Sequence, residues 1–261
     1  MPSHLLSSVF VGIAVGGVGG YLGSLMVSKR MALAGDALGH VALPGLGLGL
    51  IFHFDPGVGA FLFVLLGIFL VWLLGVLTPL SLETAIGIVF VTSLAVGFLI
   101  VPQPELLESL IGDVSQVSPR AAVVSVLLCG AVFLLVKHIY AGMMLLNISE
   151  DLARVQGISL AKYNFLYLLS IALVVSLGVK VTGTLLVGAL VILPAATSKN
   201  AGKNLSQYAY GSLAVGAVSC LLGILIQRFT RFPAGPSIIL VNSLLFGLSL
   251  LLRKPSSGAP V

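Results

Sequence analysis

The sequence predicts an all-α, polytopic membrane protein with about eight to nine transmembrane helices. Hydrophobic residues make up 58% of the 261 residues and charged residues only 8%, whereas a soluble domain carries about 25% charged residues. So few charges could not cover a water-soluble globule of this size. A helical span needs about 20 apolar residues, so nine spans would use roughly 180 of the chain. We therefore expect one transmembrane domain over residues 1–261, with loops but no second catalytic domain.

Long apolar runs locate the candidate spans. They lie at about residues 5–27, 31–54, 58–77, 83–101, 119–138, 163–180, 182–198, 207–227 and 235–252. The second run is the least regular, because it contains Asp36, His40 and Pro44. If it is re-entrant or broken, the number of spans falls. The first run has neither a basic residue before it nor a small-residue cleavage site after it, so we interpret it as a span.

The basic residues predict the orientation. Nine alternating passes place Lys29, Arg30, Lys137, Arg154, Lys162, Lys199, Lys203, Arg253 and Lys254 on one side, and Arg120, Lys180, Arg228 and Arg231 on the other. The positive-inside rule assigns the richer side to the cytoplasm. Segment 139–162 is then cytoplasmic and segment 102–118 extracytoplasmic. The net charge of +5 fits such loops better than a nucleic-acid partner.

Three glycines in the first run recur at helical spacing. Gly12, Gly16 and Gly20 are each four residues apart, so on a helix they form one smooth stripe where a second helix can lie close. The stripe predicts either tight packing within one subunit or an interface between subunits.

The segment Gly35-Asp36-Ala37-Leu38-Gly39-His40 is the richest candidate site. Asp36 and His40 are four residues apart, which on a helix puts a carboxylate and an imidazole one turn apart on one face. Both groups bind divalent first-row metals, and ionisable residues at membrane depth are candidates for function. A hydrogen bond that only ties helices together is the alternative. Pro44 would break the helix, and freed backbone at this depth is tolerated where it lines a cavity.

His53 and Asp55 stand at the other end of the same run. They could form an outer metal site where a cation arrives, or they could be solvated loop residues near the interface.

A short helix is predicted in the long segment 139–162. Ser149 is a good N-cap, acids follow in the first turn, and a glycine ends the helix. A soluble partner could grip such a protruding helix, or it could be a loop helix without a partner. If a partner binds this helix, we expect the residues that couple the two proteins to be Ser149, Glu150, Asp151, Leu152, Ala153, Arg154 and Gly157.

Motifs for nucleotide hydrolysis and common enzyme chemistry are missing from the sequence. There is no G-x-x-x-x-G-K-[ST] phosphate loop, no G-x-S-x-G elbow and no H-E-x-x-H zinc-protease helix. We therefore expect a transport subunit without its own ATPase motif, and no permanently bound cofactor.

Residues 30–45 (RMALAGDALGHVALPG) resemble the permease subunit of the bacterial ABC importers for zinc, manganese and iron. Residues 83–90 (ETAIGIVF) resemble the start of a middle span of that family. Residues 183–197 (GTLLVGALVILPAAT) resemble a late signature, and the short helix ending at Gly157 resembles the coupling region.

The resemblance implies a multi-pass protein of the bacterial inner membrane. Two permease chains would form the core, two ABC ATPase subunits would grip the short cytoplasmic helices, and an extracytoplasmic metal-binding protein would deliver the ion. Asp36 and His40 match the family's polar pair in the permeation path. A stand-alone secondary transporter or channel for divalent cations is the alternative, and an intramembrane enzyme is a third. Carboxylate and imidazole suit zinc, manganese and ferrous iron alike, so the sequence leaves the metal open.

Overall fold

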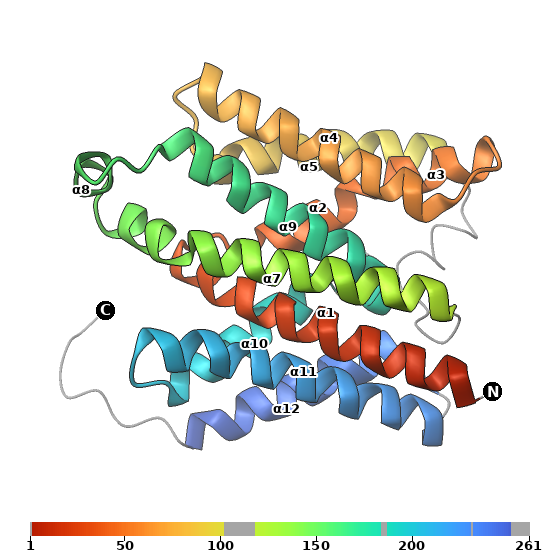
Figure 1. The fold of residues 1–261 in the computed structure, drawn as a ribbon. Helices are drawn as coiled ribbons and strands as arrows, with labels where there is room; N and C mark the ends of the chain where they lie inside the picture. Colours follow the sequence, from red (N-terminus) through yellow and green to blue (C-terminus); the bar gives the residue numbers. More distant parts are fainter. Residues whose placement is uncertain (1, 102–117, 184–186, 231, 252–261) are drawn as a thin grey trace.

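The computed structural model describes residues 2–101, 118–183, 187–230 and 232–251, and all regular structure in these ranges is helical. Figure 1 shows long helices running side by side, with the short α8 at one end and the N-terminus at the other. The helices are α1 (Pro2–Ser28), α2 (Ala34–Val41), α3 (Leu43–Ile51), α4 (Pro56–Leu77), α5 (Leu82–Ile100), α7 (Pro119–Ile148), α8 (Glu150–Val155), α9 (Leu160–Thr182), α10 (Val187–Ala201), α11 (Leu205–Thr230) and α12 (Ala234–Leu251).

Eight segments of the described chain are long and apolar enough to cross a bilayer. They are α1, the combined α2 and α3, α4, α5, α7, α9, α11 and α12. The predicted span 182–198 corresponds to α10, whose 15 residues rise only about 22 Å, less than the roughly 30 Å hydrocarbon core. The predicted polytopic all-α fold is confirmed, and this one run forms a shorter helix packed between α1, α11 and α12.

The glycine stripe of α1 packs within the chain. A Cβ added at Gly16 would meet the sulfur of Cys220 and the carbonyl oxygen of Gly216, and one added at Gly20 would meet the carbonyl oxygen of Ser212. These partners all belong to α11, the helix against which α1 packs most extensively. Of the two interpretations of the stripe, the structure supports packing within one subunit.

The second run is broken, as the proline predicts. The helix α2 ends at Val41 and α3 begins at Leu43, with Pro44 in the first turn of α3. Proline fits there because the amide it lacks would have no partner in that turn. The pair packs against α5 and α4, so one pass is made of two half-length helices.

The helix α7 is ten residues longer than predicted, because it continues from the expected end at residue 138 to Ile148. Lys137 and His138 indicated a boundary, but both lie exposed on the outer side of an unbroken helix. The buried face continues past them through Ile139, Met143 and Leu146. The connection to α9 is therefore much shorter than the predicted segment 139–162 and consists mainly of α8.

The close contact between α1 and α11 generates a stability prediction. We expect Gly20→Ala to push α11 away from α1, because its methyl group would meet backbone that cannot rotate aside, and to destabilise the fold by about 1–3 kcal/mol. Gly17→Ala on the same helix is the control, since its Cβ would meet only side-chain atoms at 3.6 Å or more. Thermal unfolding in detergent measures the difference, and equal midpoints for the two variants would contradict this packing.

Candidate functional site

Asp36 and His40 lie on the short helix α2. Asp36 is in its first turn and His40 in its last, and both side chains are half-buried. The two groups are near enough to interact electrostatically. The structure therefore places the carboxylate and the imidazole one turn apart on one helix, within a segment that is long and apolar enough to cross a membrane.

His40 has an unused ring nitrogen. Its Nδ1 atom is buried and has no hydrogen-bond partner among the described residues, and the ring lies 5.7 Å from the ring of Phe90 on α5, measured between centroids. A buried polar atom without a partner is unusual and calls for a reason. In the part of the chain that the structure describes, no hydrogen bond joins Asp36 to His40. The structure therefore gives no support to the alternative that the two residues only form a hydrogen bond that ties helices together.

A cavity of about 260 Å³ borders Asp36. One wall comes from α2 and the preceding turn, and the other from α5. Most of its lining is apolar, and its two carboxylates belong to Asp36 and Glu83. Glu83 was not among the predicted site residues. An acid next to an apolar run was the available signal, but only the packing of α2 on α5 reveals that it faces the same cavity as Asp36.

The helix α10 packs directly behind Asp36. A Cβ added at Gly188 would come within 2.5 Å of the Asp36 Cβ and 3.0 Å of its backbone nitrogen. Any larger residue at this position would therefore displace α2 or α10. Gly188 lies in the late signature 183–197, of which residues 184–186 fall outside the described ranges.

The described residues contain no cluster of three or more His, Cys, Asp or Glu side chains that could hold a metal ion. Asp36 and His40 by themselves are too few to enclose a metal ion as a permanently bound, fully coordinated centre.

His53 and Asp55 lie beyond α3, away from Asp36 and His40. Asp55 is the N-cap of α4, and its Oδ1 accepts hydrogen bonds from the backbone amides of Gly57 (2.7 Å) and Val58 (3.2 Å). His53 has a positive φ of 56° in the exposed turn. Asp55 thus has a structural role that needs no metal, and the structure does not bring this pair to the cavity beside Asp36.

The predicted short helix is present as α8. The Oγ of Ser149 accepts a hydrogen bond from the backbone amide of Leu152 at 3.3 Å. Glu150 and Asp151 occupy the first turn, and Gly157 follows the helix with a φ of 75°. Ala153 is fully buried and anchors the helix, whereas Arg154 and Glu150 form an exposed pair at 3.8 Å. Such exposed pairs contribute little to stability.

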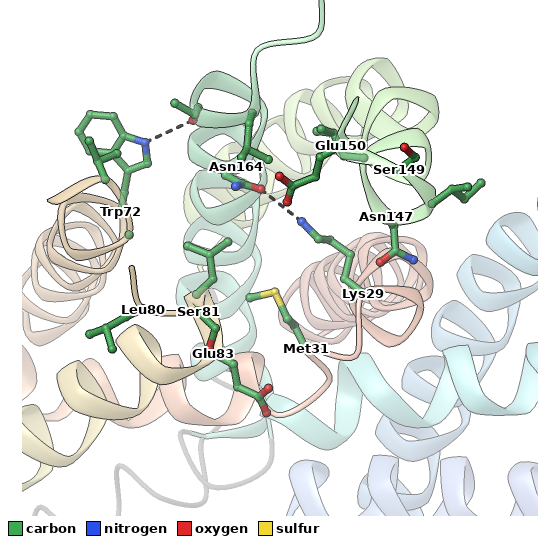
Figure 2. A pocket seen from close by; sticks show the side chains of 17 residues that line it. Lys29, Met31, Trp72, Leu80, Ser81, Glu83, Asn147, Ser149, Glu150 and Asn164 are labelled. Atoms are coloured by element: carbon green, nitrogen blue, oxygen red, sulfur yellow. Dashed lines mark hydrogen bonds between the residues drawn. The ribbon is translucent and has the colours of Figure 1, made fainter. Parts of the chain in front are cut away.

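A larger cavity of about 820 Å³ lies at the α8 end (Figure 2). Lys29 points into it, donates a hydrogen bond to Asn164 Oδ1 at 3.2 Å and lies 5.1 Å from the centre of the Tyr167 ring. Burial lowers the pKa of Lys29 to about 8, and the nearby Glu150 carboxylate opposes this shift. The ammonium is therefore still mostly protonated at pH 7.

Comparisons with known proteins agree with this architecture. The sequence model of the ABC 3 transport family matches residues 1–253. The chain is 29% identical to the high-affinity zinc uptake system membrane protein ZnuB of Haemophilus influenzae, over 96% of this chain and 98% of that protein. It is also 29% identical to the manganese import system permease protein ScaB of Streptococcus gordonii, over 95% of this chain and 91% of that one.

A solved structure shares the fold as well. PsaBC from Streptococcus pneumoniae in complex with Fab superposes with a TM-score of 0.82 at 27% identity, covering 95% of this chain and 91% of that chain. Because the family model extends over nearly the whole sequence, this chain belongs to the ABC 3 transport family.

Proposed function

We propose that this chain is the permease subunit of an ATP-binding-cassette importer in the bacterial inner membrane, and that its cargo is a divalent transition-metal ion. The observation that carries the proposal is the pair of Asp36 and His40 on a broken membrane helix, with Asp36 at a cavity and His40 Nδ1 unpartnered among the described residues. Relatives named for zinc uptake and manganese import support it.

The pair supplies the chemistry that such cargo needs. Carboxylate oxygen and neutral imidazole nitrogen bind zinc, manganese and ferrous iron. Asp36 and His40 hold the ion only transiently, because each chain contributes just two ligands there. Transport requires binding that is strong enough to admit the ion and weak enough to release it.

The helix α8 receives the force of ATP hydrolysis in this proposal. Its outer surface presents Leu152 and Val155, which are 47% and 86% exposed, next to Ile148 at 79%. Apolar side chains left exposed beyond the membrane helices are typical of an interaction site. Separate ABC ATPase subunits bind this patch and move it.

The distribution of basic residues supports a cytoplasmic location of the α8 end. Among the described residues, Lys29 and Arg30 follow the end of α1, Arg154 lies in α8, Lys162 is near the start of α9, and Lys199 and Lys203 flank the connection from α10 to α11; these helix ends lie toward α8 in Figure 1. Arg120 at the start of α7 and Lys180 and Arg228 near the ends of α9 and α11 belong to the opposite helix ends, and Lys137 lies within α7. Positive charge is retained on the cytoplasmic side. An extracytoplasmic metal-binding protein then delivers the ion at the opposite end, and a second permease copy completes the pathway.

Substitution of the two ligands tests the metal path. We expect Asp36→Asn and His40→Ala each to lower metal uptake about tenfold or more, which corresponds to the loss of about 1.4 kcal/mol of interaction. Uptake of Zn²⁺ and Mn²⁺ into proteoliposomes that contain the permease, its ATPase subunits and its binding protein measures the effect. Normal assembly with normal uptake in both variants would reject these roles.

The coupling helix makes a separate prediction. We expect Val155→Asp to weaken association with the ATPase subunits about tenfold, because it puts a charge into an apolar contact. Ser159→Asp is the matched control, since it adds the same charge at an exposed position just beyond the helix. Copurification of the ATPase subunits reports the outcome, and equal recovery with both variants would place the docking surface elsewhere.

The close approach of Gly188 to Asp36 makes a third prediction. We expect Gly188→Ala to displace Asp36 and to reduce uptake without removing any ligand. Gly130→Ala on α7 is the control, because an added Cβ there has no neighbour within 4 Å. The same proteoliposome measurement applies. Full activity of Gly188→Ala would show that the position of Asp36 against α10 is not critical.

A further inference from the structure

Two cavities near the α8 end of the chain share lining residues. The 260 Å³ cavity beside Asp36 and the 820 Å³ cavity at the α8 end are both lined by Met31 and Glu83. Each of these residues therefore faces Asp36's cavity and the larger one. In the view of Figure 2, the Met31 side chain lies between Glu83 and Lys29.

We propose that Glu83 is the exit ligand of the metal path, the carboxylate that receives the divalent ion from Asp36 and passes it into the larger cavity. The proposal rests on the proposed function. It adds a residue and a direction: the ion leaves between α2 and α5, past Met31. Met31 is buried, and its flexible, unbranched side chain can move aside more readily than a branched one.

The carboxylate of Glu83 is available for this role. The N-terminus of α5 is capped by Ser81, whose Oγ accepts the backbone amide of Thr84 at 3.2 Å, so the helix does not need Glu83 as its cap. Among the described residues, Glu83 has neither an ion-pair nor a hydrogen-bond partner. Its side chain is exposed to the cavities rather than packed away.

The cation in the larger cavity does not neutralise Glu83. Lys29 donates to Asn164, lies over the ring of Tyr167 and is near Glu150. Its ammonium is thus directed to α9 and α8 (Figure 2). Glu83 is left as the carboxylate between Asp36 and the wider space, and a single carboxylate binds a divalent ion too weakly to trap it.

Two substitutions test the exit ligand: the isosteric Glu83→Gln, which removes the charge, and the conservative Glu83→Asp, which keeps it. In the reconstituted complex with Zn²⁺ or Mn²⁺ as cargo, we expect Glu83→Gln to lower the maximum uptake rate about tenfold, while the metal concentration at half-maximal uptake changes less than twofold. Glu83→Asp keeps the carboxylate and is expected to restore most of the rate. A role confined to helix stability would not separate the maximum rate from half-saturation in this way.

The outcomes separate this inference from the proposed function. If the wild type imports metal, Asp36→Asn does not, and Glu83→Gln equals the wild type, Glu83 is not an exit ligand and the proposed function stands. If the wild-type complex imports neither Zn²⁺ nor Mn²⁺, the proposed function fails and the exit ligand with it.

A labelling experiment covers the case in which Glu83→Gln does not assemble. In Glu83→Cys, a membrane-impermeant thiol reagent supplied at the α8 side should react with the new thiol, and Zn²⁺ should slow the reaction. The native Cys129 and Cys220 are buried, so the wild type provides the background. The proposal would be overturned if the thiol does not react from that side, or if Zn²⁺ does not change the rate at which it is labelled.

Discussion

The cost of placing charged and polar groups at membrane depth governs the arrangement around α2. An ionisable side chain in the bilayer is tolerated where it faces a cavity or a partner rather than lipid. Asp36 meets this condition at a cavity between α2 and α5. The break before Pro44 meets it too, because α3 packs against α4 and α5. The half-length helices of this pass are therefore covered by neighbouring helices.

Much of the fold follows from local signals in the sequence. Apolar runs locate eight membrane-crossing segments, and Pro44 predicts the break between α2 and α3. The end of α7 is harder to predict, because the apolar run 119–138 stops at Lys137 and His138 whereas the helix continues to Ile148. A helix carries such residues on its outer side without ending, and only its packing against α1 and α9 shows that the buried face continues.

Some features of the candidate site can likewise be predicted from the sequence, whereas others depend on the packing of helices. The spacing of Asp36 and His40 is a property of one helix, so the sequence alone predicts their shared turn, and Ser149 and Gly157 likewise predict the limits of α8. The contact of Gly188 with Asp36 and the cavity shared with Glu83 join residues far apart in the chain. No periodicity within a single run carries that information.

Few residues separate the α8 end of the chain from Asp36. The Asn147 side chain at the end of α7 donates to the carbonyl oxygen of Ser28 at 2.9 Å, and Lys29 donates to Asn164 on α9. These bonds join α7 and α9 to the end of α1, and α2 begins only five residues after Lys29. A movement that α8 transmits to the end of α7 or the start of α9 would therefore either carry this turn with it or break hydrogen bonds worth about 1 kcal/mol each. Either response acts on the segment that leads into Asp36, so these bonds are the mechanical link that the proposed function requires between α8 and the Asp36–His40 pair.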